Sequence, residues 1–374
     1  MDFTLSPDTE ALRDLATEIL EDRSTTDHLS ALARDGRWWD LDTHRTLAEA
    51  GVVGAVVPEE LGGAGLGYLD LHHVLLALGA SVAQVPLWED VVLGALPLVR
   101  HGSPEQQQRL LPDLAAGRSH LTAAMLEPGS TDPLRPETTA RATDDGWEVN
   151  GTKTQVTLAS EATRVLVAAR LAEGPGTVLL LVDPTASGVT LEAQETVAGR
   201  PASRMTLESV AVGHADVLGP VGSDSPLEDV VLHASAGLAA IAAGVASRAL
   251  RLAAAYTSGR EQFGQPLATF QAVRQRLADA YIDVEAMRLT SLQAAWRLDA
   301  DLDAEDAVQV AKFWAGDGGH RVVHTAQHVH GGMGIDLDYE LHRCYRMAKW
   351  VEFTLGAGNQ QLRHIGRRLA EQTA

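Results

Sequence analysis

The sequence predicts an α+β protein of several domains, in which a β-rich segment lies between two helical segments. A chain of 374 residues is long enough for two or three domains of roughly 150 residues each. Apolar residues recur every three or four positions before residue 119 and after residue 222, whereas short β-forming runs fill the segment between them. We therefore expect a helical domain at 1–118, a β-domain at 119–222 and a second helical domain at 223–374.

The first domain is predicted to be helical because residues 8–21, 41–50 and 69–78 carry apolar side chains at helical spacing. Between these helices, segment 57–67 is rich in glycine. It lacks the strand–loop–helix frame of a dinucleotide-binding fingerprint, so we expect a turn there and no phosphate site.

The middle segment is predicted to form a compact antiparallel sheet or barrel. Residues 121–125, 146–149, 163–169 and 177–182 are short runs of β-formers, separated by clusters of Pro, Gly and Asp. No helical pattern separates the runs, which is typical of small barrels.

The last segment is predicted to be an antiparallel helical bundle that begins at Pro226. One face of a long helix is marked by Leu267, Phe270, Val273, Leu277, Tyr281, Val284 and Met287. Residues 331–334 interrupt the next helix, and residues 359–370 form another amphipathic run. Residues 230–247 carry no formal charge, but their Ala and Gly content predicts a buried bundle helix and no membrane span.

Composition excludes several classes of function. Thirty Lys and Arg residues against fifty Asp and Glu residues give a net charge of −20, which argues against nucleic acid or an anionic membrane as a partner. The single cysteine, Cys344, excludes an internal disulfide and any paired-cysteine motif. The first residues show no basic segment followed by an apolar run, so we expect no secretory signal and a cytoplasmic protein.

Three histidines have a spacing that could suit metal ligands. His320, His324 and His328 are spaced by four residues, which places them on one face of a helix. No HExxH motif or cysteine ligand accompanies them, so the sequence predicts no metal site.

Three short segments carry residues suited to ligand binding. In 256–266 a helix ends and Arg260 is presented beside a Phe-Gly turn; its planar guanidinium suits a pyrophosphate, or it simply compensates the helix dipole. In 325–334 paired glycines follow a helix and allow a ligand to approach the backbone, or they only end the helix. In 125–130 a strand ends in a Pro-Gly turn.

In this order and spacing, the segments resemble the acyl-CoA dehydrogenase family. The resemblance covers nearly the whole chain. It rests on segment 57–63, on 126–129, on 260–264 followed by Phe270-Gln271, and on 330–334 leading to 346–349. It implies an N-terminal helical domain, a middle β-barrel and a C-terminal four-helix bundle, in homo- or hetero-oligomers (dimers or tetramers) that bind FAD.

The resemblance also implies an activity in lipid metabolism. A carboxylate takes the α-proton of an acyl-CoA thioester while the flavin takes the β-hydride, and an electron-acceptor flavoprotein reoxidises the flavin. In this reading Arg260 and Gln262 reach the pyrophosphate of an FAD seated in the neighbouring subunit. The other implied cofactor-binding residues are Phe263, Gln271, His328, Gly331 and Gly332 on the adenosine side, and Thr157 near the flavin ring.

The chain departs from the family at the base. The two positions at which members usually carry it are occupied by Leu355 and Ala234, and no Asp or Glu occurs from residue 230 to 260. Glu352, one helical turn before Leu355, is the remaining candidate, unless it only pairs with Lys349.

Three functions therefore remain open. The first is an acyl-CoA dehydrogenase that uses an unusual base. The second is a base-less partner subunit of a heteromeric dehydrogenase, and the third is the same fold used for other flavin chemistry in a biosynthetic pathway.

Overall fold

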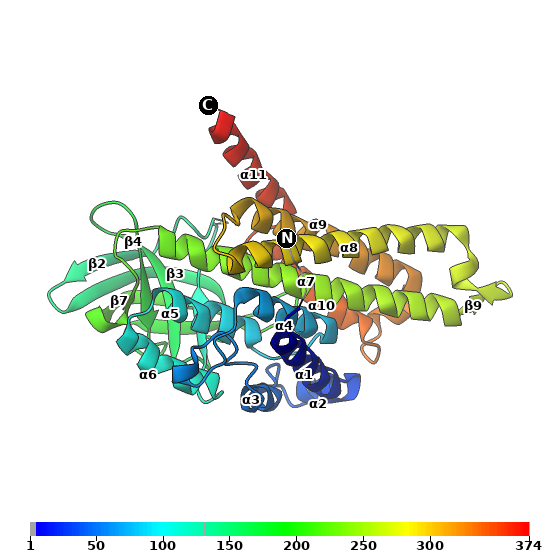
Figure 1. Ribbon diagram of the computed structural model, residues 1–374, viewed down its shortest axis with the longest axis horizontal. Coiled ribbons are helices and arrows are strands. Elements are labelled where there is room, and N and C mark those ends of the chain that lie inside the picture. The colour runs from blue at the N-terminus through cyan, green and yellow to red at the C-terminus, as the bar shows by residue number, and fades with distance from the viewer. Residues whose placement is uncertain (1–4, 131, 374) are drawn as a thin grey trace. The chain divides into compact units, whose positions relative to one another are not determined.

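The computed structural model describes residues 5–130 and 132–373 of the chain (Figure 1). Contacts divide it into two compact units. The first unit, called the helical unit here, comprises the residues up to Asp40, Tyr68–Gln84 and everything from Ser235 onward. The second, called the sheet unit, comprises Leu41–Gly67 and Val85–Ala234.

The helical unit consists of long helices. They are α1 (Pro7–Arg23), α2 (Thr26–Arg34), α4 (Tyr68–Ser81), most of α7 (Ser225–Gly259), α8 (Gln271–Asp299), α9 (Glu305–His330), α10 (Leu341–Phe353) and α11 (Gly358–Thr373). The helices expected at 8–21, 69–78 and from 226 are confirmed as α1, α4 and α7. Within α8, Val284 and Met287 are buried as their spacing predicts, but Tyr281 is exposed.

Two glycines allow α4 and α7 to cross in close contact. A Cβ on Gly244 would lie 2.1 Å from the carbonyl oxygen of Leu76, and a Cβ on Gly79 would lie 2.0 Å from that of Ile241. No real side chain tolerates such distances to backbone atoms. The small residues of the uncharged stretch therefore serve helix packing. By length and apolar content α7 meets the requirements of a membrane span, but 83% of its most apolar window is buried inside the protein.

The sheet unit combines one sheet with short helices: α3 (Leu41–Glu49), the π-helix η2 (Trp88–Ala95), α5 (Leu96–His101) and α6 (Pro104–Ala115). The strands are β1 (Leu121–Ala124), β2 (Thr139–Thr143), β3 (Gly146–Thr157), β4 (Arg164–Leu171), β5 (Thr177–Val182), β6 (Val189–Gln194), β7 (Ala202–Gly213) and β8 (Val217–Leu218). Each β-run expected from the sequence lies in or overlaps one of these strands.

The prediction of an antiparallel sheet is wrong for two strand pairs. The strand order is β6-β7-β3-β2-β4-β5-β8, and β4 also pairs with β1. The β1–β4 and β2–β4 pairs are parallel. Parallel neighbours need a long connection, and here the β2–β3 hairpin lies within the connection from β1 to β4. Within the described residues no ladder joins β6 to β8, so the strand path does not close.

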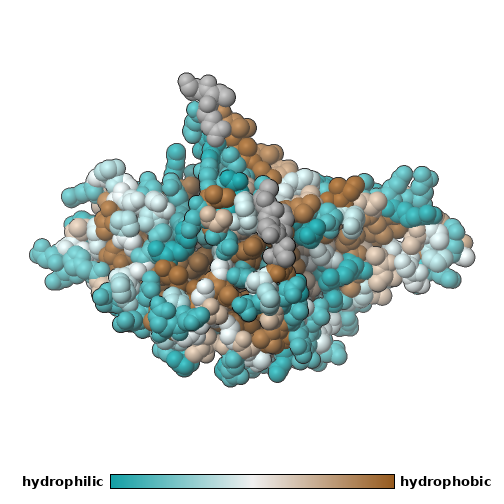
Figure 2. Space-filling view, viewed as in Figure 1, coloured by the Kyte–Doolittle hydropathy of each residue, from teal (hydrophilic) through white to brown (hydrophobic). Residues whose placement is uncertain are grey.

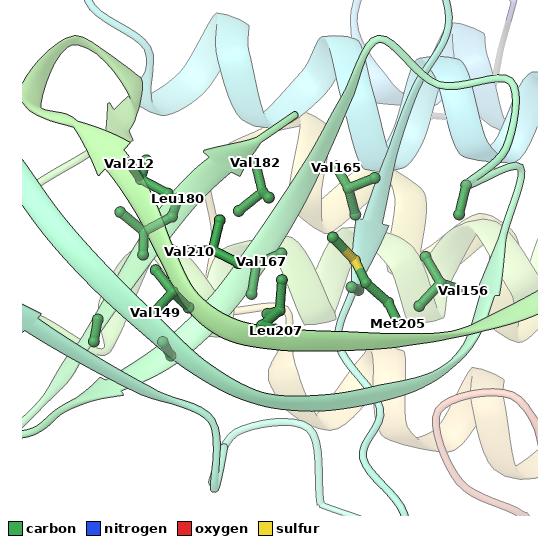
Figure 3. Close-up of a cluster of buried hydrophobic side chains, with 14 of the residues drawn as sticks. Val149, Val156, Val165, Val167, Leu180, Val182, Met205, Leu207, Val210 and Val212 are labelled. Carbon is green, nitrogen blue, oxygen red and sulfur yellow. The ribbon is translucent and has the colours of Figure 1, made fainter. Parts of the chain in front are cut away.

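The core of the sheet unit lies between β3, β4, β5 and β7, whose labelled side chains point toward one another in Figure 3. Strands β4 and β5 are buried on both faces. Val167 and Leu180 face this core, whereas Leu166 and Leu181 line a small cavity with Leu93 of η2. The two strands therefore hold η2 against the sheet.

The glycine crossing gives a test of packing in the helical unit. Gly244→Ala should lower the free energy of unfolding by about 1–3 kcal/mol, because α4 and α7 must move apart to admit the methyl group. Gly366→Ala is the matched control: Gly366 is exposed on α11 with no atom near its Cβ position, so alanine should stabilise by up to about 1 kcal/mol. Urea unfolding of the variants measures both changes, and equal effects at the two positions would contradict the close crossing.

Candidate functional site

The segment that follows α7 is a short exposed hairpin, β9 (Glu261–Gln262) with β10 (Gln265–Pro266). Its two-residue turn, Phe263 and Gly264, has φ values of +54° and +78°. Such turns match the twist of the strands, but the left-handed region costs a non-glycine residue conformational energy. Phe263 is 92% exposed, and its ring lies edge-on to that of Phe270, with the ring centroids 6.2 Å apart.

Arg260 at the base of this hairpin is exposed, and its backbone N–H donates to the carbonyl oxygen of Tyr256 at 2.8 Å. Within the described residues its guanidinium makes no hydrogen bond or ion pair. Gln262 is also exposed, and its side-chain amide donates to the carbonyl oxygen of Glu261 at 2.8 Å. The donors of Arg260 are thus available to a ligand, and a diphosphate is the anion that a guanidinium and an amide suit.

The glycine pair lies at the end of α9, where Gly331 adopts φ +59° and both glycines are exposed. His330, just before them, is buried and donates its Nδ1–H to the carbonyl oxygen of Ala326 at 2.8 Å. Its Nε2 lies 3.1 Å from the hydroxyl of Tyr339, so Nε2 accepts. Burial lowers the pKa of the His330 imidazole, which therefore stays neutral in this tautomer.

The hairpin and the glycine turn are brought together by one aromatic contact. Tyr256, in the last turns of α7, stacks on His330 with ring centroids 4.3 Å apart and planes inclined by 23°. Gln271, at the start of α8, and His328 are both exposed. Tyr256 and His330 lie within the predicted segments 256–266 and 325–334, but the sequence alone assigned neither of them a positioning role.

The turn after α10 carries Leu355, which the family resemblance implies to occupy one of two base positions. Leu355 is buried and adopts φ +56°, followed by Gly356 at φ +95°. A leucine in the left-handed region costs roughly 1–2 kcal/mol, so the surroundings must hold it there. Gln361 contributes, because its Nε2 donates to the carbonyl oxygens of Leu355 and Gly356 at 3.0 and 3.1 Å.

Lys312 of α9 fixes the same turn from inside the protein. It is fully buried, and its Nζ donates to the carbonyl oxygens of Val351 and Gly356, each at 2.9 Å. Burial lowers the pKa of the Lys312 amine to about 7, although the negative charge of Glu352 opposes this change. The sequence analysis missed Lys312, whose signal was a lone lysine within an apolar helical run.

The fallback base, Glu352, lies in an ion-pair network. Its Oε2 accepts from Lys349 Nζ at 2.7 Å and lies 3.3 Å from Nδ1 of His320. Lys349 Nζ also lies 2.6 Å from the same His320 nitrogen. His320 stacks on His324, whose Nε2 is 2.9 Å from the hydroxyl of Tyr345. The Glu352 carboxylate is therefore engaged in an ion pair with Lys349 and is not free to accept a proton from a ligand.

In the sheet unit, Thr157 is buried at the end of β3, and Ala234 is buried in α7. The Pro-Gly turn is held by Glu127, which accepts from Lys153 Nζ at 2.7 Å and from the backbone N–H and hydroxyl of Thr138. Burial alone would raise the pKa of the Glu127 carboxyl, but Lys153 and these hydrogen bonds lower it overall. Glu127 is thus an ionised anchor of the turn.

The pKa of Lys312 predicts a pH dependence of stability. Its ordinary pKa is 10.5, so between pH 7 and 10.5 the unfolded chain binds more protons and the folded protein gains stability as the pH rises. In Lys312→Met this contribution to the slope, up to about 1.4 kcal/mol per pH unit, should vanish. Denaturant unfolding at several pH values measures the slope. The exposed control Arg276→Met should keep it. An unchanged slope in Lys312→Met would contradict the lowered pKa of the buried amine.

Comparison with known proteins identifies the family. Models of the acyl-CoA dehydrogenase N-terminal, middle and C-terminal domains match residues 6–118, 122–210 and 229–370. Acyl-CoA dehydrogenase FadE27 of Mycobacterium tuberculosis is 39% identical over all of both chains. A chain of the ChsE4–ChsE5 complex from the same organism is 39% identical with a TM-score of 0.93, and a chain of a variant Tcur3481–Tcur3483 steroid ACAD is 40% identical with a TM-score of 0.91; each match covers 99% of both chains. The chain belongs to the acyl-CoA dehydrogenase family of oxidoreductases.

Proposed function

We propose that this chain is a base-less subunit of a heteromeric, FAD-dependent acyl-CoA dehydrogenase. It completes the nucleotide site of a partner subunit, and the partner supplies the carboxylate base. The observation that carries the proposal is the contrast between two parts of the helical unit: the exposed hairpin offers unpaired donors, whereas the turn after α10 offers no base.

Three positions support the absence of a base in this chain. Leu355 and Ala234 cannot accept a proton, and both are buried. Glu352 lies three residues before Leu355, but Lys349 Nζ donates to its Oε2 at 2.7 Å. To act as a base it would have to give up this ion pair. General-base help is worth on the order of 10²–10⁴ in rate, so a subunit without it is nearly inert alone.

The hairpin supports the part of the proposal that concerns the cofactor. Arg260 and Gln262 would hold the diphosphate of FAD through charged and amide donors, and the exposed Phe263 ring would cover the adenosine side together with the Gly331–Gly332 turn. Bound FAD supplies hydride acceptance from the β-carbon of the thioester. Because the hairpin projects its donors into solvent, we assign them to an FAD seated in the partner, as the family resemblance implies.

Two further observations support an oligomer. Tyr281, Ile282 and Leu289 leave exposed apolar surface on α8, and Figure 2 shows further apolar colour along α11, where Leu362 is exposed. Two of the similar structures are two-component assemblies by name, ChsE4–ChsE5 and Tcur3481–Tcur3483. The second is named a steroid ACAD, so we propose a steroid-bearing acyl-CoA thioester as the substrate, in cytoplasmic lipid metabolism with a flavoprotein as electron acceptor.

The first test follows flavin in the assembly. The chain expressed alone should lack the flavin absorption bands, and co-expression with a base-bearing homologue should restore them. Arg260→Met should weaken flavin retention of the co-expressed complex about 10–100-fold, the effect of losing a charge-assisted contact. The control Arg274→Met removes a nearby exposed guanidinium from α8 and should retain flavin. Full flavin content and turnover of the isolated chain would overturn the proposal.

The second test restores a carboxylate at the family's base position. Leu355→Glu keeps the backbone strain of the wild type and should raise acyl-CoA oxidation at the sites that use this turn by about 10²–10⁴, with an optimum near neutral pH because burial raises a carboxyl pKa. Leu355→Gln, of the same shape but unable to accept the proton, should gain nothing. If Glu352→Gln abolished turnover in the wild-type background, Glu352 would be the base and the chain would be self-sufficient.

A further inference from the structure

We propose that His44, Asp90 and His120 form a binding site for one zinc ion in the sheet unit. The three residues come from three segments distant in the sequence: α3, the π-helix η2 and the residue before β1. One ligand atom from each lies within 4.8 Å of the other two. The site is independent of the proposed dehydrogenase function.

The geometry of the cluster centres on Oδ2 of Asp90. This oxygen lies 2.7 Å from Nδ1 of His120 and 2.9 Å from Nε2 of His44. His44 is buried, and its Nε2 makes no properly directed hydrogen bond although it faces the carboxylate. A buried ring nitrogen without a hydrogen bond is costly, and a metal ion would satisfy its lone pair.

The charge of Asp90 sets this cluster apart from similar ones. Other carboxylates of the sheet unit pair with a permanent cation: Glu89 with Arg200, Glu127 with Lys153, and Asp229 with Arg100. Asp90 is fully buried, yet among the described residues its partners are only two imidazoles and the backbone N–H of Leu121. A divalent cation would supply the missing permanent charge.

The donor set selects the metal. Two imidazoles and one carboxylate are typical zinc ligands, whereas Ca²⁺ and Mg²⁺ prefer oxygen throughout. Ligands at 2.0–2.1 Å around tetrahedral zinc are about 3.3 Å apart, so the ion would spread the present contacts by roughly half an ångström. Leu121 N–H, 2.9 Å from Oδ1, already orients the carboxylate from outside. The His120 side chain is 14% exposed, so water would complete the coordination from this side as the fourth ligand.

The experiment uses the full chain, with its partner if it needs one to remain soluble, after dialysis against a chelator. Calorimetric titration with ZnCl₂ should give one high-affinity ion per chain, and CoCl₂ should give the visible absorption bands of tetrahedral Co²⁺. His44→Gln and His120→Gln should each weaken zinc binding at least about 100-fold. Circular dichroism checks that both variants fold. If the buried substitution His44→Gln prevents folding, His120→Gln at the partly exposed position tests the site instead.

A second His–Asp–His cluster provides the matched control. His101 and His233 both contact Asp229, but Arg100 already neutralises that carboxylate. His101→Gln should therefore leave the zinc stoichiometry and affinity unchanged. Absence of high-affinity binding, or binding that survives both His44→Gln and His120→Gln, would overturn the proposal and identify the cluster as a hydrogen-bonded trio.

Discussion

A lysine amine buried under a turn is the constraint around which the candidate site is built. The Nζ of Lys312 holds the carbonyl oxygens of Val351 and Gly356, and between them Leu355 is kept in a backbone conformation that leucine avoids. The side chain at position 355 is therefore presented by a rigid frame, whatever its chemistry. Leucine cannot accept a proton, so the frame holds a side chain that cannot act as a base.

Much of the fold was predictable because helices and strands each leave a local pattern of apolar residues in the sequence. The helices α1, α4 and α7 follow from apolar spacing, and the strand β5 follows from a run of β-formers bounded by turn residues. The parallel pairing of β1 with β4 was not predictable in this way. Strand direction depends on which distant segment supplies the hydrogen-bond partner. Turn residues between consecutive strands instead favour antiparallel pairing of neighbours in the sequence. The antiparallel prediction failed for that reason.

The candidate site was likewise predictable where its residues are contiguous in the sequence and not where distant segments meet. The exposed hairpin and the glycine turn were found because motif residues are contiguous, and the structure joins them through Tyr256 and His330, which no spacing rule links. The pairing of Glu352 with Lys349 was weighed from their three-residue spacing and is present. The proposed zinc ligands His44, Asp90 and His120 carry no sequence signal, because each comes from a different element and only the folded sheet unit brings them together.

The turn formed by Phe263 and Gly264 has a consequence for how the protein is handled in the cell. Phe263 is 92% exposed and its backbone lies in the left-handed region, so in the isolated chain its apolar ring lies in water. In the proposed assembly, a subunit released from the ribosome without its partner would leave the Phe263 ring uncovered. In the proposed heteromer, balanced synthesis of both components would then limit how much functional assembly accumulates.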